Sequence, residues 1–190
     1  TPFNSGGSDD LAPVPQYDGN IAGMETHVGK KAGGTQKYEE RTGESYRYDP
    51  LGRLDSSRFH TWNSGSGSWN AHGQEYLTTY EYDANGNITK LIRHSYTQSG
   101  STEMDSLTYH YKAGQTNRID YVFDAVAGDP HSEDLENTQS AGNYEYDPVG
   151  NLTQDNDEGG MTVEWSAYGK VKEIDRDIPM PSPVAAEEIT

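Results

Sequence analysis

Tyrosines alternate with polar residues at several places in the chain, and each such segment leads into a turn. In residues 46–48 (Tyr-Arg-Tyr) and 80–82 (Tyr-Glu-Tyr), the aromatic residues are two positions apart, so both project from one face of a β-strand. Apolar residues do not recur at the three- and four-residue spacing of an amphipathic helix, and the chain holds 21 glycines. This pattern predicts strands and turns without any helix.

A nine-residue segment recurs along the chain, which constrains the fold more than local propensity does. Residues 46–54, 80–88 and 144–152 align without gaps. Their shared positions are Tyr48, Asp49, Gly52 and Leu54; Tyr82, Asp83, Gly86 and Ile88; and Tyr146, Asp147, Gly150 and Leu152. We call the second aromatic residue of each copy the anchor and the last residue the closing aliphatic.

Three further copies are weaker. Residues 163–171 keep the anchor as Trp165, together with Gly169 and a closing Val171. Residues 109–119 have a turn two residues longer, and residues 17–21 are a shortened version near the start. The steps between anchors are irregular, so inserts of variable length are expected between the copies.

Each copy predicts a β-hairpin. Asp, Pro and Gly at the first, second and fourth turn positions, as in residues 49–52 and 147–150, favour a type I turn whose Gly takes a positive φ at a bulge. The closing aliphatic then resumes the apolar face on the returning strand. Between the hairpins, residues 63–68 form a Gly/Ser turn that places Trp62 and Trp69 opposite each other.

The composition is compatible with such a sheet and with little else. Only 31% of the residues are hydrophobic and the formal net charge is −17, a combination typical of disorder. The 14 Tyr, 3 Trp and 3 Phe oppose that, because aromatic side chains bury large areas and favour strands. Aromatic residues therefore supply most of the apolar surface that the chain can bury. A thin sheet with one polar face fits this composition better than a thick hydrophobic core.

The domain organisation follows from where the repeat lies. We expect an extended N-terminal tail over residues 1–15, one repeat domain over 16–177 and an extended, Pro-rich C-terminal tail over 178–190. Residues 124–142 form a long acidic excursion within the domain. The first residue is Thr1, so the chain is interpreted as processed or cut from something longer.

Charge and cysteine content exclude several classes. The chain has no cysteine, so disulfides and thiolate metal sites are impossible. No apolar stretch approaches the roughly 20 residues that span a bilayer, so no membrane insertion is expected. A polyanion repels phosphates over most of its surface, so nucleic acid is not expected as a partner.

The Tyr-x-Tyr-Asp-x-x-Gly-Asn/Arg-Leu/Ile unit resembles the YD repeat of RHS-repeat proteins, known from bacterial polymorphic toxins and from teneurins. Residues 16–24 and 107–119 look most like RHS proteins of Bacteroidetes-type bacteria, and the similarity covers roughly residues 16–174. The resemblance implies a curved, open sheet of consecutive antiparallel hairpins, a ribbon or partial shell. In relatives such a shell encloses or presents a toxin or effector.

Five or six hairpins are too few to enclose a cavity, so the resemblance implies a shell segment. The leading hypothesis is a non-enzymatic, secreted, extracellular or cell-surface scaffold. Its partners would be other RHS-repeat segments or identical subunits at the sheet edges, or an enclosed toxin. Two alternatives stay open: a filament subunit that polymerises by edge-strand or terminal-segment addition, and a carbohydrate-binding surface.

Candidate chemical sites are few. No cofactor is expected, although the clustered acids Asp155, Asp157 and Glu158 begin like a calcium loop; the twelfth position is Ser166, which rules out an EF-hand. The six histidines show no metal-ligand spacing, and no catalytic residues can be defended. Ser106 lies in a short motif, Asp-Ser-Leu, that resembles the O-glycosylation site of Bacteroidetes-type secreted proteins. The sequons that begin at Asn87 and Asn151 share one repeat position and are explained by the repeat itself.

Overall fold

The computed structural model describes residues 16–32, 36–97, 100–115, 117–126, 139–157 and 160–176. These residues form strands and turns, with no helix among them. The strands are β1 (Gly23–Ala32), β2 (Gln36–Tyr48), β3 (Leu54–Asn63), β4 (Ser68–Ala71), β5 (Thr78–Tyr82), β6 (Ile88–Thr97), β7 (Gly100–Tyr111), β8 (Ile119–Asp124), β9 (Tyr144–Tyr146), β10 (Leu152–Asp155), β11 (Met161–Trp165) and β12 (Val171–Asp175). The predicted tails, 1–15 and 178–190, lie outside the described residues, as do residues 127–138 of the acidic excursion.

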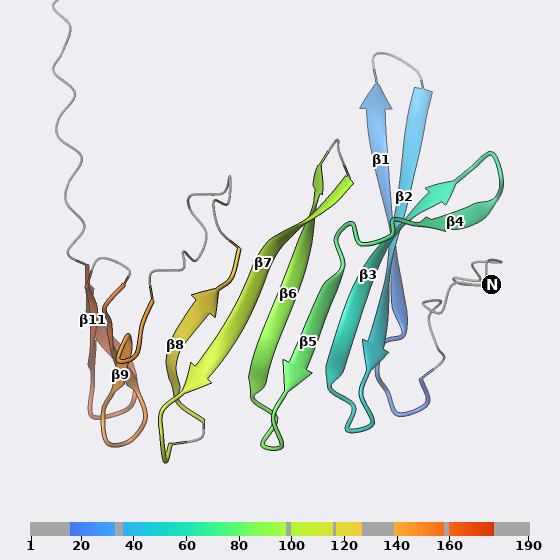
Figure 1. Cartoon of the computed structure of the whole chain (residues 1–190). Coiled ribbons are helices and arrows are strands. Elements are labelled where there is room, and N and C mark those ends of the chain that lie inside the picture. Colours follow the sequence, from blue (N-terminus) through green and yellow to red (C-terminus); the bar gives the residue numbers. More distant parts are fainter. Residues whose placement is uncertain are drawn as a thin grey trace, which may run out of the picture. The chain divides into compact units, whose positions relative to one another are not determined.

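The strands form two open antiparallel sheets. One sheet has eight strands in the order β1-β2-β3-β5-β6-β7-β8, with β4 paired to β3, and the other has the order β12-β11-β10-β9 (Figure 1). Each hairpin strand pairs with its sequence neighbour, for example Tyr46 with Ser57 and Tyr80 with Leu91. The prediction of an all-β chain of antiparallel hairpins in an open sheet is confirmed.

The chain divides into two compact units. One comprises Thr1–Tyr109 with Phe123–Asn137, and the other comprises His110–Val122 with Thr138–Thr190. The first unit holds β1–β6 and most of β7, and the second holds most of β8 and the whole four-stranded sheet.

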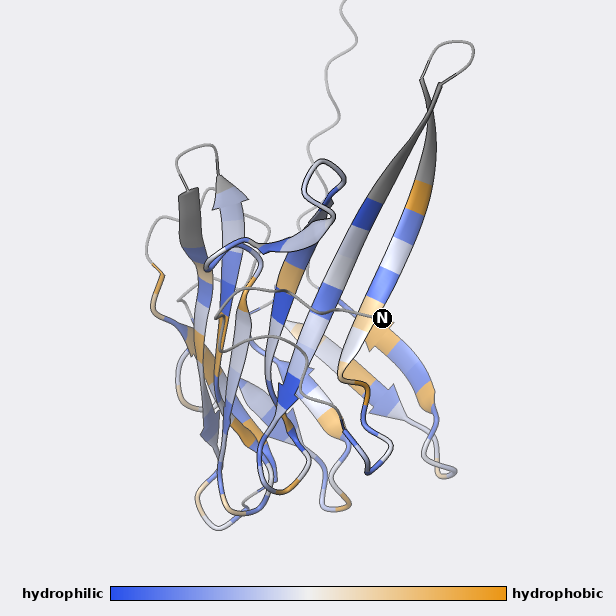
Figure 2. Ribbon diagram, turned by 90° about the vertical axis from the view of Figure 1, so that its right-hand side faces the viewer, coloured by the Kyte–Doolittle hydropathy of each residue, from blue (hydrophilic) through white to orange (hydrophobic). Residues whose placement is uncertain are grey.

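Apolar burial is sparse in both units. Within the described ranges, the buried hydrophobic side chains are Trp69, Leu107, Val122 and Val163. Figure 2 accordingly shows mainly hydrophilic ribbon, interrupted by short hydrophobic segments. A sheet with so small an apolar core needs other interactions to hold its strands in register.

Among the described residues, buried polar side chains outnumber buried apolar ones, and several of them make hydrogen bonds. In the first unit, the Ser45 hydroxyl and His60 Nε2 are 2.8 Å apart, and the Ser106 amide donates to Asp124 Oδ1 at 2.9 Å. In the second unit, the Val122 amide donates to Gln139 Oε1 at 2.9 Å. Because an unpaired buried polar group is costly, these pairs fix particular strand registers.

The insert between β3 and β4 carries an aromatic pair. Trp62 is opposite Trp69 in the register, with ring centroids 5.3 Å apart and planes tilted by 68°. The Arg41 guanidinium lies 4.3 Å from the Trp62 ring centroid. The predicted contact between the two tryptophans is confirmed, and Arg41 adds a cation–π interaction that the sequence did not indicate.

Candidate functional site

Five of the repeat copies close their hairpins with the same backbone hydrogen bond. The amide of the residue after the anchor donates to the carbonyl of the residue before the closing aliphatic. These bonds are Asp49 to Arg53 at 2.9 Å, Asp83 to Asn87 at 2.9 Å, Lys112 to Arg118 at 2.8 Å, Asp147 to Asn151 at 2.9 Å and Ser166 to Lys170 at 2.8 Å. The weak copies at 109–119 and 163–171 are therefore true hairpins.

The turn glycines have the backbone conformation that the sequence predicts. Gly52, Gly86, Gly150 and Gly169 all have positive φ, from 70° to 103°. A β-carbon at Gly86 would meet nothing within 4 Å, so a substitution there would be strained only through its backbone.

The turn aspartate organises each clear copy. Asp83 Oδ1 accepts the Asn85 and Asn87 amides at 2.9 Å each, and Oδ2 accepts Asn87 Nδ2 at 2.8 Å. Asp147 makes the same bonds to Asn151, which explains both sequon asparagines structurally. In the first clear copy Arg53 replaces the asparagine and pairs with Asp49.

These bonds favour the ionised carboxylates. The Arg53 amide, above all, holds the pKa of Asp49 below its ordinary value, and the Asn87 side chain does the same for the pKa of Asp83. Partial burial raises the pKa of Asp147, but the hydrogen bonds from Asn151 and its neighbours outweigh that effect, so the pKa is lowered overall.

A β-bulge follows the closing aliphatic in four copies. The register pairs Tyr48 with Leu54 and Arg47 with Ser56, which leaves Asp55 unpaired. The same one-residue shift leaves Thr89, Thr153 and Lys172 unpaired in the other copies. A bulge increases the local twist of the strand just where it leaves the turn.

The anchor side chain reaches back to the preceding repeat. Tyr82 Oη donates to the Leu54 carbonyl at 2.7 Å, and Tyr48 Oη donates to the Ile21 carbonyl at 2.9 Å. Trp165 Nε1 donates to the Leu152 carbonyl at 2.6 Å. In all three cases the acceptor is the closing aliphatic of the copy before, and we call this contact the anchor lock.

The antiparallel pairing explains why that carbonyl is available. Hydrogen-bonded and non-hydrogen-bonded residue pairs alternate along an antiparallel ladder. Because Asp49 bonds to Arg53, the next pair, Tyr48 with Leu54, is the non-hydrogen-bonded kind, and the Leu54 carbonyl points away from β2 toward the following strand. The turn geometry of one hairpin thus presents the acceptor for the next.

Two arginines reinforce the same junction. The Arg53 guanidinium lies 4.6 Å from the Tyr82 ring centroid, and its Nη1 donates to the Asp83 carbonyl at 3.0 Å. In the second unit, Arg118 lies 5.6 Å from the Tyr146 ring centroid. Burial raises the pKa of both Tyr82 and Tyr146, so their hydroxyls stay protonated and Tyr82 remains a hydrogen-bond donor.

The repeat residues predicted from sequence are therefore brought together, but the anchor lock itself was missed. One signal could have indicated it. Every anchor is Tyr or Trp, each with a polar donor at the ring edge, and none of the three Phe residues occupies an anchor position.

The shortened first copy does not form a hairpin. Tyr17 lies in a bend before β1 and is 97% exposed. Asp18 still accepts the Asn20 amide at 3.1 Å, as the turn aspartates do, and Ile21 supplies the carbonyl for Tyr48. This copy therefore lacks the hairpin but keeps the acceptor.

An exposed aromatic cluster lies in the insert that follows β4. Tyr76 packs edge-on against Phe59 at 5.2 Å and stacks with Tyr96 at 6.4 Å, while Tyr76 and Tyr96 are 51% and 54% exposed. Tyr76 has a φ of 54°, a strained conformation for a bulky residue. His72 fixes this turn by bonding to Thr61 at 2.6 Å and Glu75 at 2.7 Å.

The structure describes two of the three acidic calcium candidates, Asp155 and Asp157. Asp155 is buried, and its Oδ1 accepts Asn143 Nδ2 at 3.0 Å and the Asp157 amide at 3.2 Å. Glu158 lies outside the described residues. Within the described part of the chain, no three His, Asp or Glu side chains cluster in a way that could hold a metal ion.

Ser106, the residue predicted as a glycosylation site, has little exposed surface. It lies in β7 with its side chain buried, between the fully buried Asp105 and the buried Leu107. The burial of Ser106 leaves little room for a glycan on the folded chain, and its O-glycosylation stays a prediction. The motif instead forms part of the sheet interior, where Asp105 pairs with Arg93 at 2.6 Å.

A cleft of about 230 Å³ lies in the second unit, lined mainly by polar groups around Gly142 and Asn156. Asn156 Nδ2 donates to the Gly142 and Asn143 carbonyls at 2.9 and 3.1 Å. These internal bonds close the loop on itself and do not converge on a ligand position. In the described part of the chain there is also no helix long and apolar enough to cross a bilayer.

The anchor lock predicts a selective effect of removing one hydroxyl. We expect Tyr82→Phe to lower the free energy of unfolding by about 0.5–1.5 kcal/mol, because the Leu54 carbonyl loses its donor. Tyr80→Phe is the matched control in the same strand, because its hydroxyl donates no hydrogen bond in the described structure. Urea denaturation measures both, and equal effects would contradict the lock.

The lowered pKa values of the turn aspartates predict acid sensitivity. Each carboxylate binds its proton less tightly when folded, so its contribution is present above the ordinary pKa of 3.8 and is lost as the pH falls through the lower folded pKa. We expect stability to decrease below about pH 4, and Asp83→Asn to flatten that decrease. An unchanged pH profile of this variant, measured by urea denaturation, would contradict the assignment.

No model of a known protein family matches the chain, and no curated protein matches it.

Proposed function

We propose that the chain is a non-enzymatic structural scaffold, a ribbon segment of a secreted YD-repeat protein of the RHS type. The observation that supports this most directly is the anchor lock, which joins one hairpin to the next through residues that define the repeat. The anchors of these locks and the turn aspartates form hydrogen bonds with other residues of the repeats. The work of such a segment is to continue a sheet that encloses or presents another polypeptide.

The buried polar residues support the same proposal. His60, Asp105 and Asp155 have the chemistry of catalytic groups, yet each bonds to a neighbour within the sheet. Partnering of this kind holds the strand register, and it leaves no paired acid and base facing a cleft among the residues that the structure describes.

The proposal is tested by two measurements: where the protein is found, inside or outside the cells, and how fast protease cleaves the chain and its variants. In the organism that encodes the chain, peptide mass spectrometry of the culture fluid should find these residues outside the cells, in a polypeptide with further YD hairpins. The chain with Tyr82→Phe and Trp165→Phe should be cleaved by added protease about fivefold faster or more, because cleavage follows the open population.

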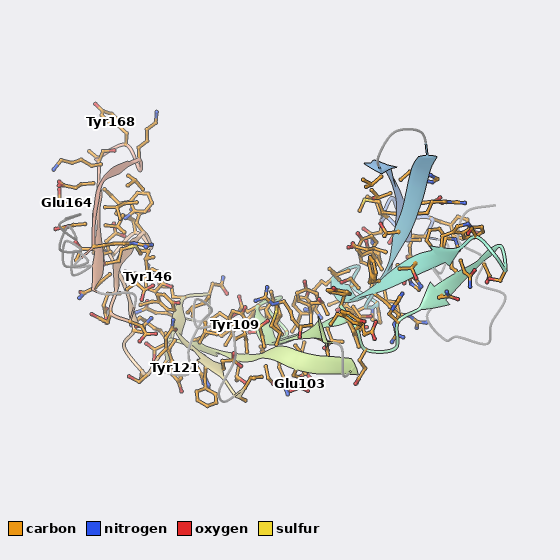
Figure 3. The ribbon with its side chains drawn as sticks, turned by 90° about the horizontal axis from the view of Figure 1, so that it is seen from above. Glu103, Tyr109, Tyr121, Tyr146, Glu164 and Tyr168 are labelled. Carbon is orange, nitrogen blue, oxygen red and sulfur yellow. The ribbon has the colours of Figure 1, made fainter. Side chains whose placement is uncertain are left out.

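Tyr168→Phe is the control for that experiment, since Tyr168 is 92% exposed at the β11–β12 turn and projects away from the ribbon (Figure 3). Recovery only from inside the cells would contradict the proposal. Cleavage of the lock variant at the rate of the control would contradict it too.

A second candidate function, carbohydrate binding, is favoured by the Tyr76–Tyr96 pair. Both rings are about half exposed, and Tyr76 has a φ of 54°, which is a strained conformation for a bulky residue. Aromatic faces of this kind stack on sugar rings. We expect glycan-array binding by the intact chain to be lost in Tyr76→Ala and kept in Tyr168→Ala; no binding by the intact chain would reject this function.

A further inference from the structure

The turn between β5 and β6 contains the only Asn-Gly pair in the sequence, Asn85-Gly86. We propose that Asn85 is a spontaneous modification site, where loss of ammonia from its side-chain amide converts it to aspartate and isoaspartate and loosens this hairpin. The inference goes beyond the scaffold function and does not depend on it.

The reaction needs only the chain and water. The deprotonated Gly86 amide nitrogen attacks Asn85 Cγ and forms a new N–C bond, while the bond from Cγ to Nδ2 breaks and Nδ2 takes a proton from water and leaves as ammonia. Water then opens the succinimide ring that results. Attack at Cγ gives aspartate, whereas attack at the main-chain carbonyl carbon gives isoaspartate, in which the chain runs through Cβ. The net change is hydrolysis of an amide, with no oxidation or reduction.

Both residues of the pair are accessible. Asn85 and Gly86 are exposed at the tip of the turn that joins β5 to β6 (Figure 1). A β-carbon at Gly86 would meet no other described atom within 4 Å, so there is space beside this residue for the ring. Because glycine has no side chain, nothing on Gly86 itself shields the attacking nitrogen.

The Asn85 side chain is not held in place. Its nitrogen and oxygen make no hydrogen bond to any described residue. A set of other asparagines in the described ranges is held by side-chain hydrogen bonds, and none of them precedes a glycine: Asn20, Asn63, Asn87, Asn143, Asn151 and Asn156. A held side chain must first break its bonds before Cγ can turn toward the next nitrogen. Asn85 needs no such step.

The turn does not require an asparagine at this position. The equivalent residues of the other clear copies are Leu51 and Val149, whose amides donate to the turn aspartates at 2.9 and 3.0 Å. The Asn85 amide makes the same bond, to Asp83 Oδ1 at 2.9 Å. Asn85→Leu should therefore keep the hairpin and remove only the reaction.

The products weaken the turn in two ways. Both place a new carboxylate near that of Asp83, and the formal net charge changes from −17 to −18. Isoaspartate also lengthens the main chain inside the turn, where the Gly86 amide donates to the Asp83 carbonyl at 3.2 Å. The same hairpin holds Tyr82 against the Leu54 carbonyl, so its distortion loosens the anchor lock.

Peptide mapping by mass spectrometry, after incubation of the folded chain in mildly alkaline buffer, tests the reaction. Trypsin releases residues 59–90 as one peptide, which also contains Asn63, Asn70 and Asn87 as internal references. We expect deamidation at Asn85 to be at least about tenfold faster than at these three, with isoaspartate among the products. An Asn85 that reacts no faster than the references would overturn the proposal.

Protease cleavage of the aged chain tests the effect on the hairpin. After incubation, the chain should be cleaved between β5 and β6 about threefold to tenfold faster than before, the effect of one lost hydrogen bond. Asn85→Leu is the matched control, and its cleavage rate should not change on incubation. Equal cleavage of fresh and aged chain, or the same increase in the Asn85→Leu chain, would overturn the proposal.

Discussion

A hydrogen bond from the edge of an aromatic ring to a backbone carbonyl of the preceding repeat is the interaction on which this ribbon depends. The chain has few aliphatic residues to bury, and in its described part four hydrophobic side chains are buried. Strands held only by such a core would slip in register, because a shift of one residue exchanges the two faces of a strand. The anchor lock prevents the slip, since Tyr82 reaches the Leu54 carbonyl in one register only.

The lock also explains why the turn sequence is so specific. The Asp and Gly residues set the closing hydrogen bond, that bond fixes the alternation of pairs, and the alternation directs the acceptor carbonyl outward. The bulge that follows turns the strand beside that carbonyl. Each such hairpin therefore presents the acceptor carbonyl for the anchor of the next hairpin. In other repeat proteins, too, stability comes from contacts between neighbouring repeats.

The sequence predicts those parts of the fold that depend on residues close together in the chain. Alternating tyrosines, turn residues and the Trp62–Trp69 pair each have their own signal within ten residues. The anchor lock joins residues 13 to 28 positions apart, such as Tyr48 and Ile21, and its acceptor is a backbone atom with no residue type to mark it. The Asp-Ser-Leu motif is short, and its sequence does not indicate that Ser106 is buried in β7.

Exchange of the side-chain donor protons, observed by NMR, tests the central claim most directly. The hydroxyl protons of Tyr48 and Tyr82 and the indole proton of Trp165 should exchange slowly with water and show close contacts to residues 21, 54 and 152. The hydroxyl protons of the exposed Tyr17 and Tyr168 in dilute solution are the internal reference for fast exchange. Anchor protons that exchange as fast as this reference would show that the hairpins are not joined as described.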